Sequence, residues 1–164
     1  MKYLVPAFLI FYSVLFPAAA QGASCYTPSE AAAEQALRLH SELLVIGLNC
    51  QNIKQAGGED TYRKYKDFTQ KHADLLEAYE DRLIRHFKKH GSHSPEKDLD
   101  SLRTDLANDL AQVVADVRPD VFCFRHMERL NMARAMSGKD VDNWARTYFP
   151  AMPPSKPFCM DSGF

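Results

Sequence analysis

The sequence has few signals for β-strands, and beyond residue 16 it has no apolar run long enough to cross a membrane. It also lacks a nucleophile elbow, a phosphate-binding glycine loop, a His-Glu-x-x-His helix and a Cys-x-x-Cys redox pair. An excess of charge is absent too, since 20 Lys and Arg stand against 21 Asp and Glu. Because phosphate binding needs a basic footprint, we expect no nucleic-acid partner, and we expect no enzymatic activity.

The first twenty residues have the order of a secretory signal peptide. Lys2 precedes an apolar run over 3–16, and three alanines end at Ala20. We expect cleavage after Ala20 and a periplasmic or secreted mature protein without a transmembrane segment. The expected organisation is a leader over 1–20, a helical domain over 21–149 and an extended tail over 150–164 that Cys159 ties back.

Four cysteines follow this leader: Cys25, Cys50, Cys123 and Cys159. An even number of cysteines in an exported chain predicts two disulfides. The alternative for Cys25 is lipoprotein processing, but Gly22 stands where a lipobox prefers leucine. Lipidation would also leave an odd number of thiols, so two disulfides are the favoured interpretation.

Helix caps and apolar spacing predict an all-α fold of four long helices plus a short fifth helix. Thr27 and Glu30 form a capping box at the start of the first helix. Gly91 is expected to end the second helix, and Asp140 to cap the fifth. The expected helices run over 28–50, from about 62 to 91, over 95–118, over 119–138 and over 140–148.

The order of these helices predicts which cysteines pair. Short connections make neighbouring helices antiparallel, which gives an up-and-down bundle. Cys50 is the last residue of the first helix, and Cys123 lies at the start of the fourth helix, at the same end of the bundle. Cys25 precedes the first helix at the other end, and Cys159 lies in a tail that is free to reach it. We therefore predict the disulfides Cys50–Cys123 and Cys25–Cys159.

A resemblance to a known family rests on four segments: Leu43–Cys50, Phe122-Cys123, Cys25–Pro28 and the late Cys159. These segments resemble a family of small exported helical proteins of α-proteobacteria that are known only as hypothetical proteins. The resemblance implies a periplasmic location and the same two disulfides. It brings no catalytic residues.

Two clusters of side chains are candidate metal ligands. His86, His90 and His93 have spacings of four and three, so that two imidazoles on one helix face can bind zinc or copper. The alternative is that the helix dipole favours histidine near a helix C-terminus. The second cluster is His126, Met127, Met132 and Met136, which suits copper(I). Methionine at helical spacing is, however, also a common filler of cores.

A third candidate is a basic and aromatic patch on the predicted second helix. Tyrosines and basic residues are interleaved over 62–66, and Arg82, Arg85, Lys88 and Lys89 follow. Such a patch can bind an anionic polymer, a lipid headgroup or an acidic partner. Acidic residues interrupt it, which favours a solvated helix face with ion pairs at four-residue spacing.

The sequence thus predicts a non-enzymatic interaction or accessory protein of the bacterial envelope, without a cofactor. Its partner is expected to be another envelope protein or a wall component. The alternative is a periplasmic metal-binding module that uses His86, His90 and His93, or the helix with His126, Met132 and Met136.

Overall fold

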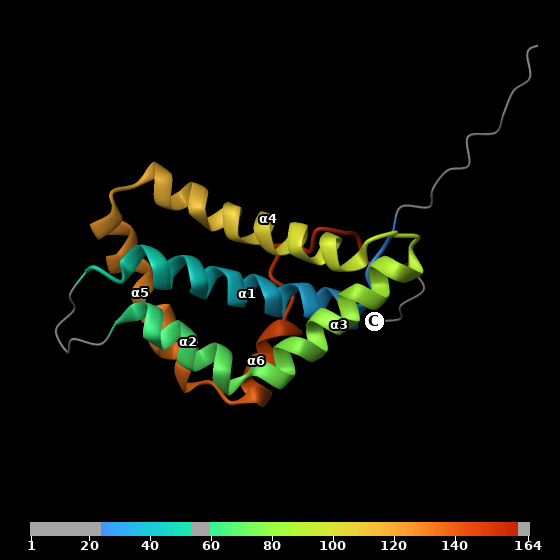
Figure 1. The fold of residues 1–164 in the computed structure, drawn as a ribbon, viewed down its shortest axis with the longest axis horizontal. Helices are drawn as coiled ribbons and strands as arrows, with labels where there is room; N and C mark the ends of the chain where they lie inside the picture. Colours follow the sequence, from blue (N-terminus) through green and yellow to red (C-terminus); the bar gives the residue numbers. More distant parts are fainter. Residues whose placement is uncertain (1–23, 54–59, 161–164) are drawn as a thin grey trace, which may run out of the picture.

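The computed structural model describes residues 24–53 and 60–160 of the chain (Figure 1). These residues form six helices and one isolated β-bridge, which confirms the predicted all-α class. The predicted leader lies outside the described residues, and so do the last four residues of the tail. The helices are α1 (Pro28–Cys50), α2 (Thr61–Lys71), α3 (Ala73–Lys89), α4 (Pro95–Asp116), α5 (Pro119–Ala135) and α6 (Gly138–Ala145).

Helix α1 lies at the centre of the fold and packs against each of the other five helices (Figure 1). Its start has the predicted capping box. The Glu30 N–H donates to Thr27 Oγ1 at 3.3 Å, and the Thr27 N–H donates to the Glu30 carboxylate at 2.8 Å. Within the described residues, no helix is both long and apolar enough to span a bilayer.

Two clusters of buried side chains surround the two halves of α1. We call the first the tail-end core; its members are Tyr26, Ala31, Ala32, Ala33, Ala36, Leu37, Tyr79, Leu83, Leu99, Leu106 and Ala145. We call the second the Cys50-end core; its members are Leu39, Leu43, Ile46, Cys50, Phe68, Phe122, Cys123, Met127, Leu130, Ala133 and Val141. The alanines let neighbouring segments approach α1 closely in its first half, whereas larger side chains fill the space around its second half.

The predicted second helix is two helices, so the expected set of four long helices is not the observed one. Helix α2 ends at Lys71, and His72, with φ −114° and ψ 19°, separates it from α3. The His72 N–H donates to the Phe68 carbonyl at 3.1 Å, and their rings lie 4.7 Å apart. The bend lets α2 pack on α5 while α3 packs on α4. The apolar period continues through the bend, and for that reason it did not indicate a break.

The short last helix begins earlier than predicted. Its N-cap is Ser137, whose Oγ accepts the Asp140 N–H at 3.2 Å, and the Asp140 carboxylate accepts the Ser137 N–H at 2.8 Å. Asp140 is therefore the third residue of a capping box and not the cap itself. Gly138 is the first helical residue of α6, whereas the sequence suggested that it ends the helix before.

Two disulfides join segments that are far apart in the sequence. Cys50 pairs with Cys123 at a Cα–Cα distance of 5.6 Å, and Cys25 pairs with Cys159 at 4.9 Å. Both are the pairs that the order of the helices predicts. A sulfur in a disulfide cannot carry a thioether-linked lipid, so this pairing contradicts lipidation at Cys25.

The tail is also bound to the start of the chain by hydrogen bonds. The Tyr26 N–H donates to the Pro157 carbonyl at 2.8 Å, and the Cys159 N–H donates to the Tyr26 carbonyl at 2.9 Å. Ser155 donates its backbone N–H and its hydroxyl to the buried Glu34 carboxylate, at 2.7 and 2.5 Å. The described part of the tail is therefore fixed along the first half of α1.

Candidate functional site

Helix α5 has apolar side chains on both of its faces. Its inner face contributes Phe122, Cys123, Met127, Leu130 and Ala133 to the Cys50-end core. On its outer face, Phe124 is 85% exposed and Met132 is 59% exposed. At 3.6 residues per turn, Phe124 and Met132 lie about 80° apart around the helix axis, so they occupy neighbouring parts of its outer side. A surface helix usually has one apolar stripe and a polar opposite face, so these two exposed apolar side chains stand out on the otherwise charged outer face of α5.

A groove of about 560 Å³ adjoins this outer face, where α5 meets α1 and α6. Most of the apolar side chains that line the groove are large, and the cationic side chains in the lining come from α5. The lining residues are Leu39, Arg125, His126, Glu128, Arg129, Met132, Ala133, Met136 and Trp144. We call the groove together with Phe124 the α5 surface.

The two arginines of the α5 surface differ in whether they form an ion pair. Arg129 forms an ion pair with Glu42 of α1 at 2.9 Å. Burial raises the pKa of Glu42, although Arg129 and Arg38 act in the opposite direction. Arg125 has no ion-pair partner among the described residues. The α5 surface therefore combines exposed apolar side chains with one guanidinium that is free to bind a carboxylate.

The α5 surface also brings together most of the predicted soft-ligand cluster. His126, Met132 and Met136 all line the groove, whereas Met127 is 4% exposed and belongs to the Cys50-end core. The His126 ring stacks on the Phe122 ring at 4.5 Å. Burial, with Arg129 and Arg125 nearby, lowers the pKa of His126, so its imidazole is neutral at neutral pH. A neutral imidazole is the form that ligates metals.

The other predicted metal cluster is divided between the core and a turn. His86 is 1% exposed, and its Nδ1 lies 3.1 Å from Glu30 Oε1. The His86 ring packs against His90 at 4.4 Å and Tyr26 at 4.7 Å, while His93 lies exposed in the turn after α3. Burial lowers the pKa of His86, and Glu30 opposes this effect. In the ranges 24–53 and 60–160, no group of three or more His, Cys, Asp or Glu is arranged to hold a metal ion.

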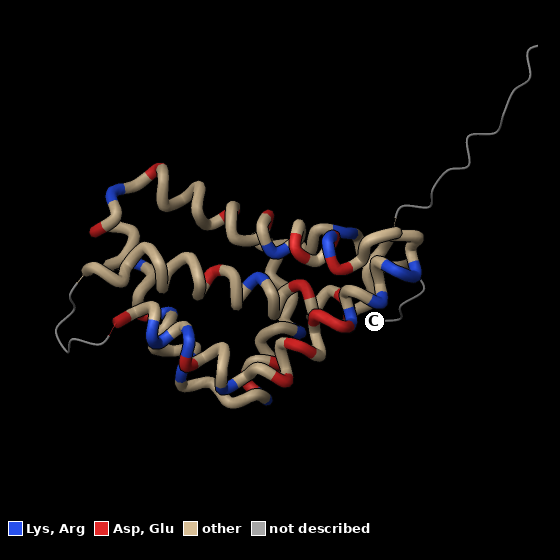
Figure 2. The backbone as a smooth tube through the Cα atoms, in the orientation of Figure 1, with Lys and Arg blue, Asp and Glu red and all other residues tan. Residues whose placement is uncertain are grey.

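The predicted basic patch is divided by acidic residues. Figure 2 shows that Asp and Glu in the first half of α3 separate the cations of α2 from those at the end of α3. Several of these cations also bind neighbouring elements. Lys64 donates to Asn131 of α5 at 2.8 Å, and Arg82 donates to the Ser29 carbonyl of α1 at 3.3 Å. These cations connect helices and do not form one continuous anion-binding surface.

One polar cluster was missed by the sequence analysis. His40 Nε2 lies 3.0 Å from both Thr69 Oγ1 and the Tyr65 hydroxyl, so this cluster joins α1 to α2. Gly47 permits the contact, because a Cβ there would lie 3.1 Å from Tyr65 Cβ. Burial, with a smaller contribution from Arg103, lowers the pKa of His40 to about 4. His40 is therefore neutral at neutral pH, and its role in this geometry is to join two helices.

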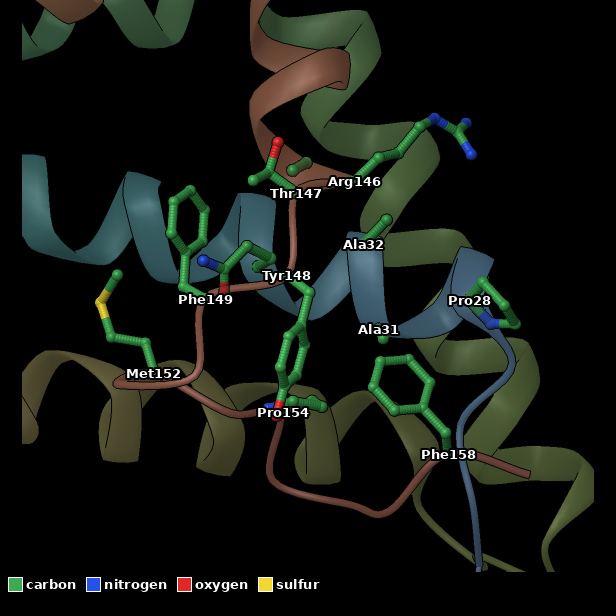
Figure 3. Close-up of a pocket in the computed structure, with 12 residues that line it drawn as sticks. Pro28, Ala31, Ala32, Arg146, Thr147, Tyr148, Phe149, Met152, Pro154 and Phe158 are labelled. Carbon is green, nitrogen blue, oxygen red and sulfur yellow. The ribbon is translucent and has the colours of Figure 1, made fainter. Parts of the chain in front are cut away.

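A second, smaller pocket lies between the start of α1 and the tail (Figure 3). Its volume is about 80 Å³. We call it the tail pocket; it is lined by Pro28, Ala31, Ala32, Gln35, Ala145, Arg146, Thr147, Tyr148, Phe149, Met152, Pro154 and Phe158. No pattern in the sequence predicts this pocket, because nothing in the tail residues indicates where the tail lies along α1.

These features define a disulfide-linked all-α protein with an exposed apolar surface on α5 and a small pocket under its tail. Comparison of the chain with protein-family models, with curated proteins and with solved structures finds no match. The resemblance noted in the sequence therefore stays a prediction. The assignment of a function rests on the geometry of the described residues.

Proposed function

We propose that this chain is a non-enzymatic interaction protein of the bacterial envelope, and that its α5 surface binds a partner protein. The observation that carries the proposal is Phe124, an aromatic side chain that is 85% exposed and directly precedes Arg125, which lines the groove. Exposed apolar patches of this kind mark interaction sites, and buried aromatic side chains supply much of the energy of protein interfaces. Met132 lies about two turns further along α5, about 80° away around the helix axis, and lines the groove.

The chemistry of the α5 surface indicates the kind of partner. A groove of about 560 Å³ accommodates several side chains, and helices commonly bind such grooves through an apolar stripe. Arg125 favours a carboxylate beside that stripe, since opposite charges at an interface fix the orientation of the partner. The expected partner is therefore an amphipathic segment of another envelope protein that carries an acidic residue.

Photo-crosslinking in cells that produce the full chain tests this proposal. A photoreactive residue at Phe124 should give one discrete adduct with another envelope protein, whereas the same residue at Tyr148, which is 58% exposed, should not. Met132→Glu and Arg125→Glu should remove the adduct. Lys89→Glu, a matched charge reversal at the end of α3, should leave it unchanged. Adducts of equal yield at both positions, or adducts that persist in Arg125→Glu and Met132→Glu, would contradict the proposal.

The envelope location is part of the same proposal. All four cysteines are paired within the described residues, and disulfides form and persist in oxidising compartments such as the periplasm. Alkylation of thiols in cell fractions, without prior reduction, tests the location. We expect a periplasmic protein in which no cysteine is alkylated. A cytoplasmic protein with four alkylated cysteines would contradict the proposed location.

A second candidate function is a copper(I)-binding module, and it is favoured by the position of His126, Met132 and Met136 around one groove. Thioether sulfur and imidazole nitrogen both suit copper(I). Competition against a copper(I) chelator measures the affinity. Met132→Leu and Met136→Leu should each weaken binding, while Met127→Leu in the core should not. Equal affinities for all three variants would exclude the groove as the metal site.

A further inference from the structure

The two disulfides differ in how deeply they are buried. Both cysteines of the Cys50–Cys123 disulfide are 0% exposed. Cys25 and Cys159, which form what we call the tail disulfide, are only partly buried, and Met160 beside them is fully exposed. A disulfide is reduced when a thiolate reaches one of its sulfurs, so exposed disulfides are the labile ones. A dithiol should therefore reach the tail disulfide in the folded chain but not the Cys50–Cys123 disulfide.

The tail depends on this disulfide for its position along α1. Its other contacts include the β-bridge at Tyr26 and the hydrogen bonds from Ser155 to Glu34. The net contribution of one hydrogen bond is not larger than the backbone entropy that is lost when one residue is ordered. Residues 150–160 contain no helix, so a few such bonds must offset the ordering of the whole segment. Cleavage of the tail disulfide should therefore let the tail leave α1.

A series of ring contacts connects the tail to the α5 surface. Phe158, next to Cys159, packs edge-on against Tyr148 at a centroid distance of 6.0 Å (Figure 3). Phe149 follows Tyr148, and its ring lies 5.4 Å from the Trp144 ring. Trp144 packs against both cores and lines the groove of the α5 surface. The position of the tail therefore affects one wall of that groove.

We propose that the tail disulfide is a redox switch, in which reduction by a dithiol releases the tail and opens the wall of the groove at Trp144. A thiolate of the dithiol attacks one sulfur of the tail disulfide and forms a mixed disulfide. The second thiol of the dithiol then displaces the cysteine, so that the S–S bond of the chain breaks and an S–S bond forms in the dithiol. Two electrons and two protons pass to Cys25 and Cys159.

The other half of the molecule should keep its structure during this step. The Cys50–Cys123 disulfide stays intact and holds the Cys50-end core, so the change is confined to the tail and the neighbouring α6. The switch is a property of the chain itself, and it does not depend on whether the α5 surface binds a partner.

Reduction of the oxidised mature chain with dithiothreitol tests the switch. Alkylation of thiols at successive times, followed by mass spectrometry of peptides, measures the reduction of each disulfide. We expect the tail disulfide to be reduced at least about tenfold faster than the Cys50–Cys123 disulfide, because attack on a buried disulfide requires prior opening of the core. Equal rates of reduction for the two disulfides would overturn the proposal.

Fluorescence measures the release of the tail in the same samples. The chain has one tryptophan, so the emission of Trp144 reports on the wall of the groove. The emission should shift to longer wavelength as the tail disulfide is reduced, because water replaces the tail beside the indole ring. An unchanged Trp144 emission after reduction of the tail disulfide alone would also overturn the proposal.

Two variants separate release of the tail from other effects of the reductant. The double variant of Cys25→Ser and Cys159→Ser should show the shifted Trp144 emission from the start, and dithiothreitol should not change it. The double variant of Cys50→Ala and Cys123→Ala keeps the tail disulfide, so dithiothreitol should shift its emission as in the unmodified chain. An unshifted emission in the first variant would refute the release of the tail. The first variant decides the question alone if the second does not fold.

Discussion

The two ends of α1 differ in how the chain covers them. At the tail end, alanines allow close packing, and a disulfide, a β-bridge and the Glu34–Ser155 hydrogen bonds hold the tail over the helix. At the Cys50 end, a disulfide of 0% exposed cysteines lies inside a core of larger side chains. Outside that core, Leu48 and Val113 are 44% and 42% exposed, and at the other end Tyr148 is 58% exposed.

This difference indicates where an interaction surface belongs. Helix α4 buries Leu99 near its start and Leu106 at its middle, but near its end Val113 is exposed. Phe124 at the start of α5 is exposed as well. The Cys50 end thus exposes apolar area on α1, α4 and α5, where a partner can cover it, while Tyr148 and Met160 are exposed in the C-terminal segment.

Removing one disulfide at a time tests the comparison between the two ends of α1. Of all the variants, these should show the largest effect. The double variant of Cys50→Ala and Cys123→Ala should lose about 4 kcal/mol of unfolding free energy, because a long loop in the unfolded chain is released and buried sulfur contacts are lost. Urea unfolding of the oxidised proteins measures this loss. The double variant of Cys25→Ala and Cys159→Ala should show a separate early transition, since the tail can open while the Cys50-end core stays folded.

Hydrogen exchange locates the two effects. Loss of the tail disulfide should raise exchange at the amides of Tyr26 and Cys159, which bridge the tail to the chain start, and leave Leu130 protected. Loss of the Cys50–Cys123 disulfide should raise exchange at Leu130. Uniform exchange increases in both variants would show that the two ends do not differ.

A pair of carboxylates on α1 gives a smaller expected difference. Glu34 is buried at the tail end and accepts two hydrogen bonds from Ser155 and one from Arg38. Glu34→Leu should cost about 3 kcal/mol, because it leaves these donors without a charged acceptor. Glu42→Leu at the Cys50 end should cost less than about 1 kcal/mol, since burial already disfavours the Glu42 carboxylate and Arg129 can reach water. Thermal unfolding of both variants checks the order, and equal losses would contradict it.

Local signals in the sequence were enough to predict some helix boundaries and not others. The capping box at Thr27 and Glu30 predicted the start of α1, and the order of the helices predicted both cysteine pairs. The break at His72 had no local signal, because it depends on the packing of α2 and α3 against different neighbours. Gly138 carried a misleading signal, since glycine both ends helices and follows caps.

The candidate sites were less predictable than the helices. Spacing grouped His126, Met132 and Met136, which do line one groove. The exposure of Phe124 and the burial of the two disulfides depend on what the rest of the chain covers. Periodicity gives the face of a helix, but the burial of that face is set by tertiary contacts.

The smallest expected difference between the two ends is in how protonation of one histidine at each end changes the unfolding free energy. His40, near the Cys50 end, has a pKa of about 4 because of burial and Arg103, against about 6.5 in the unfolded chain. Between these values the unfolded chain binds a proton that the folded chain does not, so the unfolding free energy falls as the pH decreases from 6.5 to 4. The contribution is fully present above pH 6.5. Allowing for partial exposure of the ring, we expect a loss of about 2 kcal/mol.

His86 at the tail end should contribute less in the same direction, because Glu30 at 3.1 Å stabilises its protonated form and offsets part of the effect of burial. The substitution His40→Gln keeps a group that can bond Tyr65 and Thr69 and removes the titration. Urea unfolding at pH 7 and pH 4 should therefore show a loss about 2 kcal/mol smaller in His40→Gln than in the unmodified chain. His86→Gln should change the pH dependence less. If His86→Gln changes the pH dependence of the unfolding free energy more than His40→Gln does, the tail end is the more acid-sensitive of the two ends, which would contradict this prediction.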